Sequence, residues 1–247
     1  NGLAGDMLIG AGVATAAEVC HISLGSFGPA PNFKRLAEAG QLKVIENTCG
    51  IALSMAQAGA VGAPFLAVRG LYGSDLMTTR DDFKVIDDPY HPGERVVVAP
   101  ALGPDVFLTH GAVADRDGNV VTTAGGRNDL LAAQCSRTTI VTVEAISEEP
   151  LTPASRPGWI FIPSFYVNAV VLAPRGSHPA EFRGLYPADT AHLRRYIEAD
   201  SLRYLTEEGL LRAVGETKSG NASYCTACFT LEYPIVTRET EAATATV

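Results

Sequence analysis

Short apolar runs alternate along this chain with stretches in which apolar residues recur at helical spacing. The apolar runs predict strands at residues 19–24, 42–46, 83–86, 95–99, 105–110, 138–144 and 168–173. The helical spacing predicts helices at residues 6–17, 31–39, 51–61, 129–135 and 188–199. Strands and helices therefore follow one another along most of the chain.

The strand runs are continuously apolar rather than alternating, which is typical of strands buried on both faces. Such strands separated by helices predict an α/β fold with a doubly wound, mainly parallel sheet. Ligands of such sheets bind beyond the carboxyl ends of the strands, so the loops that follow strands are the first places to look for a site. Residues 71–93 differ from the rest because they are polar and rich in turns, which indicates an insertion or a lid.

The composition of the chain excludes several classes of protein. Of the 247 residues, 47% are hydrophobic and 19% charged, so the chain has enough apolar residues for a buried core. The 27 acidic residues outnumber the 19 basic ones and give a net charge of -8, which argues against nucleic acid or an anionic membrane as a partner. No apolar run reaches the roughly 18–20 residues that span a bilayer.

The cysteines and the N-terminus bear on the compartment. The five cysteines are odd in number and scattered, which is not the pattern of a disulfide framework. The first residues have neither a basic region nor a cleavage-site pattern, so we expect a cytoplasmic protein. The five histidines show no ligand-like spacing, and we expect no metal site.

A series of motifs carries a family resemblance over residues 1–199. It runs through GDMLIGAGV, HISLGSFGPAPNFKRLAEAG, IENTCGIALSMAQAGAVGAPFLAVRGLYGSDL, PALGPDVFLTHGAVADRDGNV, IVTVEAI, IPSFYVNAVVLAPRGSHP and DTAHLRRYIEA. In this order the motifs resemble the A (alpha) subunit of family I CoA-transferases of the glutaconate CoA-transferase type. The resemblance also implies that the first strands of the family's domain precede Asn1.

The resemblance implies a definite chemistry. A glutamate attacks a donor acyl-CoA, an anhydride and then a glutamyl-CoA thioester form, and an acceptor carboxylate reverses the steps. In heteromeric members this glutamate belongs to the B (beta) subunit, which we expect as the partner. The expected substrates are a short acyl-CoA or dicarboxyl-CoA and a free carboxylic acid. Coenzyme A is thus a substrate, and no further cofactor is implied.

Cys49 stands where related ring-opening hydrolases carry the glutamate on their A-like chain, in the stretch Thr48-Cys49-Gly50. The resemblance therefore implies no catalytic nucleophile in this chain. Two alternatives remain open: a CoA-thioester or ring-opening hydrolase-like subunit, and a non-catalytic scaffold subunit. Cys49 itself is either a small buried hydrophobe or a thiolate favoured by the start of the following helix.

Six residues in loops after predicted strands are candidates for substrate binding. They are Ser26, Phe27, Glu46, Arg69, Gly73 and Ser74. Arg69 suits a substrate carboxylate, because guanidinium binds carboxylates in a bidentate manner, and the neighbouring glycines permit close approach of the backbone. The alternatives are an ordinary carboxylate at a strand end for Glu46, turn chemistry for Ser26 and Phe27, and a tight turn in which Arg69 pairs with Asp75.

Other polar residues favour structural roles. The run Asp115-Arg116-Asp117-Gly118-Asn119 is typical of a turn, because Asp and Asn bond to nearby backbone. His110 and Glu144 belong to buried strands, where a hydrogen-bonded histidine and a paired carboxylate are the expected interpretations.

Residues 200–247 change character. The stretches SLRYLTEEGLLRAVG and YCTACFTLEYPI resemble the C-terminal end of glutamine phosphoribosylpyrophosphate amidotransferase over about residues 200–236. In that family the two cysteines of CxxCF bind an iron–sulfur cluster, and here they are Cys225 and Cys228. The other parts of that enzyme are missing, so we expect no cluster. We expect a domain over residues 1–199, then an amphipathic helix at 201–214 and disorder beyond residue 239.

Overall fold

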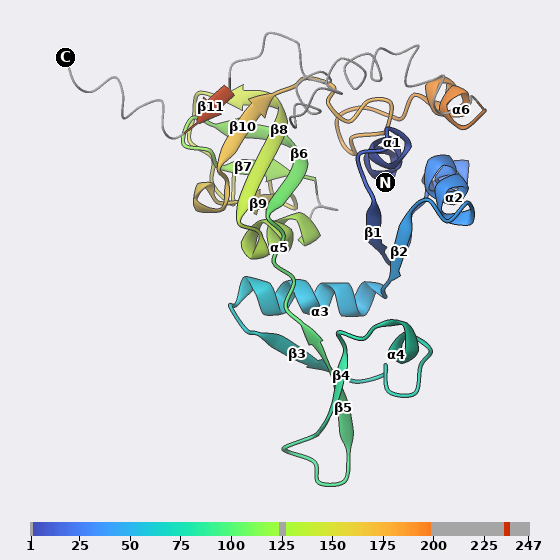
Figure 1. The fold of residues 1–247 in the computed structure, drawn as a ribbon. Helices are drawn as coiled ribbons and strands as arrows, with labels where there is room; N and C mark the ends of the chain where they lie inside the picture. Colours follow the sequence, from blue (N-terminus) through green and yellow to red (C-terminus); the bar gives the residue numbers. More distant parts are fainter. Residues whose placement is uncertain (1, 124–126, 199–234, 238–247) are drawn as a thin grey trace, which may run out of the picture. The chain divides into compact units, whose positions relative to one another are not determined.

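The structure is a computed structural model that describes residues 2–123, 127–198 and 235–237. The chain divides into two compact units (Figure 1). The first unit combines Asn1–Glu46 with Ser177–Tyr233, and the second combines Asn47–Gly176 with Pro234–Val247. None of the helices in the described ranges has the length and apolar character that a membrane span requires. The predictions for 201–214, for Cys225 and Cys228 and for residues beyond 239 lie outside the described residues.

The described part of the first unit packs three α-helices and a pair of strands. Its elements are α1 (Leu3–Gly10), β1 (Ala16–Val19), the 3-10 helix η1 (Gly25–Phe27), α2 (Pro31–Glu38), β2 (Lys43–Glu46) and α6 (Thr190–Glu198). The strands β1 and β2 pair in parallel, with Val19 opposite Glu46. The core of the unit joins both ends of its sequence and contains Leu3, Leu24, Ala180, Leu193 and Tyr196.

One carboxylate organises this unit. Asp6 is fully buried on α1, and its Oδ1 accepts the backbone N–H of Phe33 at 2.7 Å. Its Oδ2 accepts the Tyr196 hydroxyl at 2.6 Å, together with the backbone and side-chain N–H groups of Asn32. Asp6 thus caps the first turn of α2 from another helix, and the favourable helix dipole there adds to the hydrogen bonds.

The close packing around this carboxylate requires a glycine on α1. A Cβ at Gly10 would lie 2.5 Å from Cγ of Asn32. The Asn32 amide is held there by Asp6 and by the Tyr196 hydroxyl, which accepts its N–H at 2.9 Å. The helices α1, α2 and α6 therefore meet at one polar centre, which leaves no room for a side chain at Gly10.

The second unit contains a six-stranded mixed sheet in the order β11-β10-β8-β6-β7-β9. Its strands are β6 (Val106–Asp115), β7 (Val120–Thr122), β8 (Thr138–Ser147), β9 (Ile160–Ile162), β10 (Ala169–Leu172) and β11 (Ile235–Thr237). The central strands β10, β8 and β6 are parallel, while β11, β7 and β9 join antiparallel. One face of this sheet packs with α5 (Arg127–Cys135) in a core of valines, alanines and Ile162.

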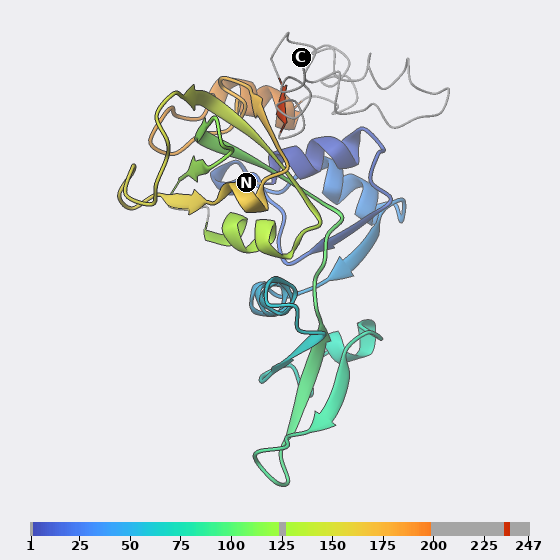
Figure 2. The same ribbon diagram turned by 90° about the vertical axis from the view of Figure 1, so that its left-hand side faces the viewer.

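A second sheet of this unit is antiparallel, in the order β3-β5-β4. Its elements are β3 (Phe65–Val68), α4 (Leu76–Thr79), β4 (Lys84–Asp87) and β5 (Arg95–Pro100), and β4 and β5 form a long hairpin (Figure 2). The helix α3 (Cys49–Ala60) packs on this sheet through Ile51 and Met55. A short 3-10 helix, η2 (Ser164–Tyr166), precedes β10.

The α/β class expected from the sequence is confirmed, and so are most of the elements. The parallel pairing is found in β10-β8-β6 and in β1-β2, whereas the remaining pairs are antiparallel. Residues 71–93 are not a separate lid, because Leu71 and Phe83 lie in the core under the β3-β5-β4 sheet.

Two expectations near the N-terminus are wrong. The helix predicted over 6–17 ends at Gly10, since Gly12 takes a φ of +72° that helices do not continue through. The strand predicted over 19–24 ends at Val19 instead, because β1 (Ala16–Val19) follows the register of its partner β2. Residues 14–17 are all small or β-branched, so their pattern did not distinguish a helix from a strand.

We predict that removing the Asp6 carboxylate destabilises the first unit. Asp6→Ala leaves buried donors of Asn32, Phe33 and Tyr196 without an acceptor, which should cost about 3–5 kcal/mol. Tyr196→Phe removes a single hydroxyl and should cost about 1–2 kcal/mol. Hydrogen exchange at the amides of α2 and α6 measures both effects.

The exposed Asp81→Asn substitution is the control and should change exchange in α2 and α6 by less than about 0.5 kcal/mol. Equal protection of α2 in the Asp6→Ala protein and the wild type would contradict the assigned role of this carboxylate.

Candidate functional site

The surface of the first unit is hollowed on two sides of α6. One depression, of about 520 Å³, is lined by Ser26, Phe27, Thr190, Arg194, Ile197 and Glu198. The other, of about 590 Å³, is lined by Pro29, Pro31, Lys34, Arg35, Glu38, Ala39 and Ile197. Both include Ile197 and lie along α6, one beside η1 and the other beside α2. We call the two depressions together the α6 groove.

Glycines shape the η1 wall of this groove. Gly25 and Gly28 flank Ser26 and Phe27, with φ values of +66° and +103° that only glycine adopts readily. The turn is closed by the hydrogen bond from the N–H of Leu24 to the carbonyl of Gly28, at 2.9 Å. Phe27 packs against the core of the unit, while Ser26 is exposed. Ser26 therefore lines the groove on a turn that Phe27 anchors in the core. No described residue forms a hydrogen bond with the Ser26 hydroxyl.

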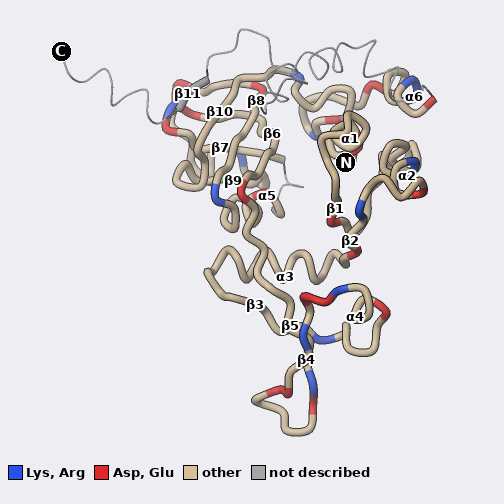
Figure 3. Tube along the Cα trace, in the orientation of Figure 1, with Lys and Arg blue, Asp and Glu red and all other residues tan. Residues whose placement is uncertain are grey.

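The groove carries charges of both signs. Lys34, Arg35 and Arg194 supply three cations, and Glu38 and Glu198 supply two carboxylates. Figure 3 shows that both α2 and α6 carry basic and acidic residues. Arg35 is partly engaged, because its Nη2 donates to Asn32 Oδ1 at 3.2 Å. An anionic group such as a carboxylate or a phosphate is the ligand that this set of cations suits.

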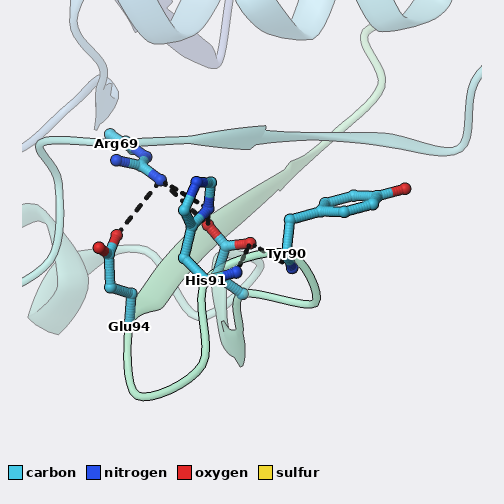
Figure 4. Close-up of polar contacts among 5 residues, drawn as sticks. Arg69, Tyr90, His91 and Glu94 are labelled. Atoms are coloured by element: carbon cyan, nitrogen blue, oxygen red, sulfur yellow. Dashed lines mark hydrogen bonds and ion pairs between the residues drawn. The ribbon is translucent and has the colours of Figure 1, made fainter.

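Arg69, the candidate carboxylate partner, lies in the second unit, where three neighbours surround its guanidinium (Figure 4). Its Nη2 lies 3.1 Å from Asp88 Oδ2, 3.2 Å from Glu94 Oε2 and 3.2 Å from His91 Nδ1. The alternative pairing of Arg69 with Asp75 is thus wrong, because the β4–β5 hairpin loop brings other carboxylates to Arg69. All three contacts use Nη2, and the Arg69 side chain is 63% exposed, so a carboxylate can approach Nε and Nη1 without displacing Asp88 or Glu94.

Asp88 is the centre of this cluster. Its Oδ1 accepts the backbone N–H groups of Tyr90 and His91, and its Oδ2 accepts from the side chains of His91 and Arg69. The backbone N–H of Tyr90, the His91 ring and Arg69 together lower the pKa of Asp88 to about 2. Tyr90 itself is 86% exposed and points away from the cluster (Figure 4).

Gly73 and Ser74 lie between β3 and α4 in the second unit. Gly73 takes a φ of +83°, and the Oγ of Ser74 is buried without a hydrogen-bond partner among the described residues. Tyr72 beside them lies under Arg95, whose guanidinium carbon is 5.2 Å from the ring centroid. These contacts order the turn, and the Ser74 hydroxyl is enclosed by it and offers no surface to a ligand.

Glu46 and Cys49 lie on either side of the boundary between the units. Glu46 ends β2, as expected, and its side chain is exposed. Cys49 is the first residue of α3, whose cap is Thr48, the side chain of which accepts the N–H of Ile51 at 3.3 Å. Cys49 is exposed, so its interpretation as a buried hydrophobe is wrong. Cys135, in contrast, is buried, and burial raises the pKa of its thiol.

His110 and Glu144 are hydrogen-bonded strand residues of the six-stranded sheet, as expected. His110 Nε2 lies 2.7 Å from Glu144 Oε1, and His110 Nδ1 lies 2.7 Å from Thr142 Oγ1. Glu144 Oε2 also accepts the backbone N–H of Arg175 at 2.6 Å. Each polar atom of the pair has a partner, which explains how β6 and β8 tolerate these side chains in their interior.

The run from Asp115 to Asn119 is the structural turn that its sequence predicts. Asp115 is 4% exposed and accepts four N–H groups, from Asp117, from both the backbone and side chain of Asn119, and from Leu151. Burial raises the pKa of Asp115, but these hydrogen bonds lower it by more, so it stays below its ordinary value.

The six candidate residues thus fall into two groups. Ser26 and Phe27 line the α6 groove of the first unit, and Glu46 lies at the end of β2 in the same unit. Arg69, Gly73 and Ser74 belong to the second unit. Lys34, Arg35 and Arg194 were not predicted from the sequence, although the basic positions on the two amphipathic helices were a usable signal.

Comparison with known proteins identifies the relatives of this chain. Residues 1–173 match the family model described as coenzyme A transferase. The A subunit of glutaconate CoA-transferase from Acidaminococcus fermentans is 36% identical over 208 residues, which is 77% of this chain and 64% of that protein. The A subunit of 3-oxoadipate CoA-transferase from Pseudomonas knackmussii is 32% identical over 74% of this chain and 65% of that protein. This chain therefore spans slightly less than two thirds of the length of each of these relatives.

The fold of this chain matches the solved structure of the first of these relatives. The crystal structure of glutaconate CoA-transferase from Acidaminococcus fermentans matches 82% of this chain and 70% of its own, with a TM-score of 0.76 and 32% identity. The cholesterol ring-cleaving hydrolase IpdA subunit of Rhodococcus jostii is a more distant relative, 28% identical over 202 residues. An amidophosphoribosyltransferase of Drosophila melanogaster matches over 49 residues only, at 49% identity.

We predict that the Arg69 cluster stabilises the β4–β5 hairpin in a pH-dependent manner. Because the folded pKa of Asp88 is about 2 and an unfolded aspartate has a pKa of about 3.9, the stabilisation is complete above pH 4. It is lost as the pH falls through 2. Asp88→Asn should therefore lower the midpoint of thermal unfolding at pH 6, and the difference from the wild type should shrink between pH 4 and pH 2.

Asp81→Asn, an exposed aspartate in the connection between α4 and β4, is the control and should leave the midpoint unchanged at pH 6. A constant difference between Asp88→Asn and the wild type over the whole pH range would show that the charge of Asp88 is not what stabilises the hairpin.

Proposed function

The chain belongs to the coenzyme A transferase family, and from that premise we propose that it is the A subunit of a heteromeric CoA-transferase. Such an enzyme moves CoA between an acyl-CoA and a carboxylic acid, and the nucleophilic glutamate comes from a B subunit. The similarity to two A subunits of CoA-transferases over about three quarters of the chain supports this assignment. The α6 groove, with Ser26 on one wall and cations on the other, is the observation that carries it.

The chemistry begins on the partner. An oxygen of its glutamate attacks the carbonyl carbon of the donor thioester, the C–S bond breaks, and the CoA thiolate leaves behind an acyl-glutamyl anhydride. The thiolate then attacks the glutamyl carbonyl and releases the donor acid. The acceptor carboxylate attacks the resulting glutamyl-CoA, and the same steps in reverse give the new acyl-CoA and the free glutamate.

This chain binds and orients the reactants in that scheme. Negative charge develops on the carbonyl oxygen at each attack, and a hydroxyl fixed on a rigid turn is a suitable donor to it. Ser26, on the glycine-flanked turn of η1, fills this role, with Phe27 anchoring the turn in the core. Arg194 and Lys34 bind anionic groups of the substrates, either a carboxylate or the phosphates of CoA.

The remaining candidates take supporting roles in the proposal. Glu46 contributes its exposed carboxylate, and the turn with Gly73 and Ser74 contributes its backbone. Arg69 binds a substrate carboxylate through Nε and Nη1, beside the carboxylates that contact its Nη2. The chain contributes no catalytic nucleophile, and the reaction requires the partner subunit.

A hydrolase-like subunit is the second candidate, because the IpdA subunit of a ring-cleaving hydrolase is also a relative. The presence of Cys49 at the position of that group's glutamate counts against it. The exposed thiol at the first turn of α3 cannot supply the carboxylate on which that assignment depends. If no B subunit confers activity on the complex, the chain is instead a non-catalytic scaffold subunit.

We predict that co-expression with a B-type subunit yields CoA exchange and that the chain alone yields none. The measurement is transfer of CoA from acetyl-CoA or glutaryl-CoA to a labelled carboxylic acid, followed by chromatography of the acyl-CoA products. Exchange by the isolated chain would disprove the proposed division of labour. Hydrolysis without transfer by the complex would favour the hydrolase-like subunit instead.

We predict that Ser26→Ala lowers kcat of the complex by roughly 10²-fold, because one donor to the oxyanion is lost. Arg194→Ala should raise KM about tenfold with little change in kcat, since a charged hydrogen bond contributes about 1.5–3 kcal/mol to binding. Steady-state kinetics of the purified complex measures both.

Arg183→Ala, an exposed arginine of the same unit outside the groove, is the control and should leave both constants unchanged. Unaltered kcat in Ser26→Ala would remove this residue from the proposed mechanism.

A further inference from the structure

A group of metal-ligating side chains lies at the first turn of α6, apart from the residues that line the α6 groove. His178, Asp189 and His192 each direct one donor atom to a common space, and these atoms all lie within 4.8 Å of one another. His178 comes from the loop after the second unit, Asp189 precedes α6, and His192 lies in its first turn. Their positions along the chain do not form a recognisable metal motif, which is why the sequence predicted no metal site.

The geometry of the group is close to that of a bound ion. His178 Nε2 lies 3.2 Å from Asp189 Oδ2, and the rings of the two histidines are 5.0 Å apart and edge-to-face, with an interplanar angle of 84°. In a tetrahedral zinc site with bonds of about 2.0–2.1 Å, the ligand atoms are roughly 3.3 Å apart. Small rotations of the imidazoles therefore bring all three donors to an ion.

The backbone holds the ligands in place. The N–H of Asp189 donates to the carbonyl of Pro179 at 3.0 Å, and the N–H of Leu193 donates to the carbonyl of Asp189 at 3.0 Å. The side chain of Asp189 uses Oδ1 for the N–H of His192, which leaves Oδ2 directed at His178. The carboxylate of Asp189 thus joins the loop that carries His178 to the first turn of α6.

We propose that His178, Asp189 and His192 bind a divalent transition-metal ion. Two imidazoles and one carboxylate favour zinc, cobalt or nickel over magnesium and calcium, which prefer oxygen ligands alone. Three protein ligands leave at least one position for water. Because α6 is also a wall of the α6 groove, the bound ion would fix that wall by joining its first turn to residues 178–179.

Arg195 lies next to the proposed site, and its positive charge weakens the binding of a cation there. Its Nη2 lies 3.2 Å from His192 Nδ1, and its positive charge repels a cation there. Arg195 is exposed, so its side chain can turn toward solvent when an ion binds. Removing this charge should strengthen metal binding, an effect opposite in sign to that of removing a ligand.

The other cluster of this kind in the described residues is less suited to a metal. Asp88, His91 and Glu94 also bring their donors within 4.8 Å. Arg69 contacts all three, so an ion at that place would have to displace a guanidinium that already neutralises the carboxylates. The cation that this second cluster binds is Arg69.

Cobalt titration of the full chain tests the proposal. The titration is followed by the visible d–d absorption of Co²⁺, and Zn²⁺ competes in a second titration. Cys225→Ser/Cys228→Ser serves as the background, so that the tail thiols do not bind the metal. We expect one saturable site per chain, displaced by Zn²⁺, without the near-ultraviolet thiolate-to-cobalt absorption.

Variants separate the site from general surface binding. His178→Ala and Asp189→Asn should each weaken Co²⁺ at least about tenfold, and Arg195→Ala should tighten it. His21→Ala, an exposed histidine of the same unit outside the group, should leave the affinity unchanged. Circular dichroism confirms that each variant is folded.

Two results would overturn the proposal. One is the absence of saturable binding in the Cys225→Ser/Cys228→Ser background. The other is binding with equal affinity in the His178→Ala, Asp189→Asn and His21→Ala proteins. Neither result bears on CoA transfer, because the reaction of the complex is measured separately and does not require the ion.

Discussion

The buried carboxylate of Asp6 is the constraint on which the first unit depends. It accepts the first amides of α2 and the hydroxyl of Tyr196 on α6, and each of these donors would lose its acceptor if the carboxylate were removed. The two helices that line the α6 groove are thereby fixed to α1. Substrate binding in the proposed transferase and the ligand group at the start of α6 both rely on the position of this one side chain.

The sequence predicted elements well where local signals end them. Pro31 and Gly40 delimit α2, and β5 and β8 were found because their runs of Val, Ile and Thr favour strands. β1 was missed because residues 14–17 are small, and a strand there is selected by its pairing with β2. β3, of only four residues, also depends on its neighbour β5, which no local pattern reveals.

The residues of the candidate site could likewise be predicted only in part from local sequence signals. Ser26 and Phe27 were found from a glycine-rich loop after a predicted strand, although that strand ends earlier than expected. Arg194 lies far along the chain from Ser26, so only tertiary packing brings the two to one groove. The partners of Arg69 could not be read from spacing either, because the loop between β4 and β5 brings Asp88 and Glu94 back to the end of β3.

The discontinuous make-up of the first unit sets an order for its synthesis on the ribosome. Residues 47–176 form a continuous stretch with its own cores, which emerges between the two parts of the first unit. Asp6 is made before that stretch and Tyr196 after it. The polar centre of the first unit therefore stays incomplete until Tyr196 has been made, whereas the cores of residues 47–176 are already present and only the edge strand β11 of their sheet is still to come.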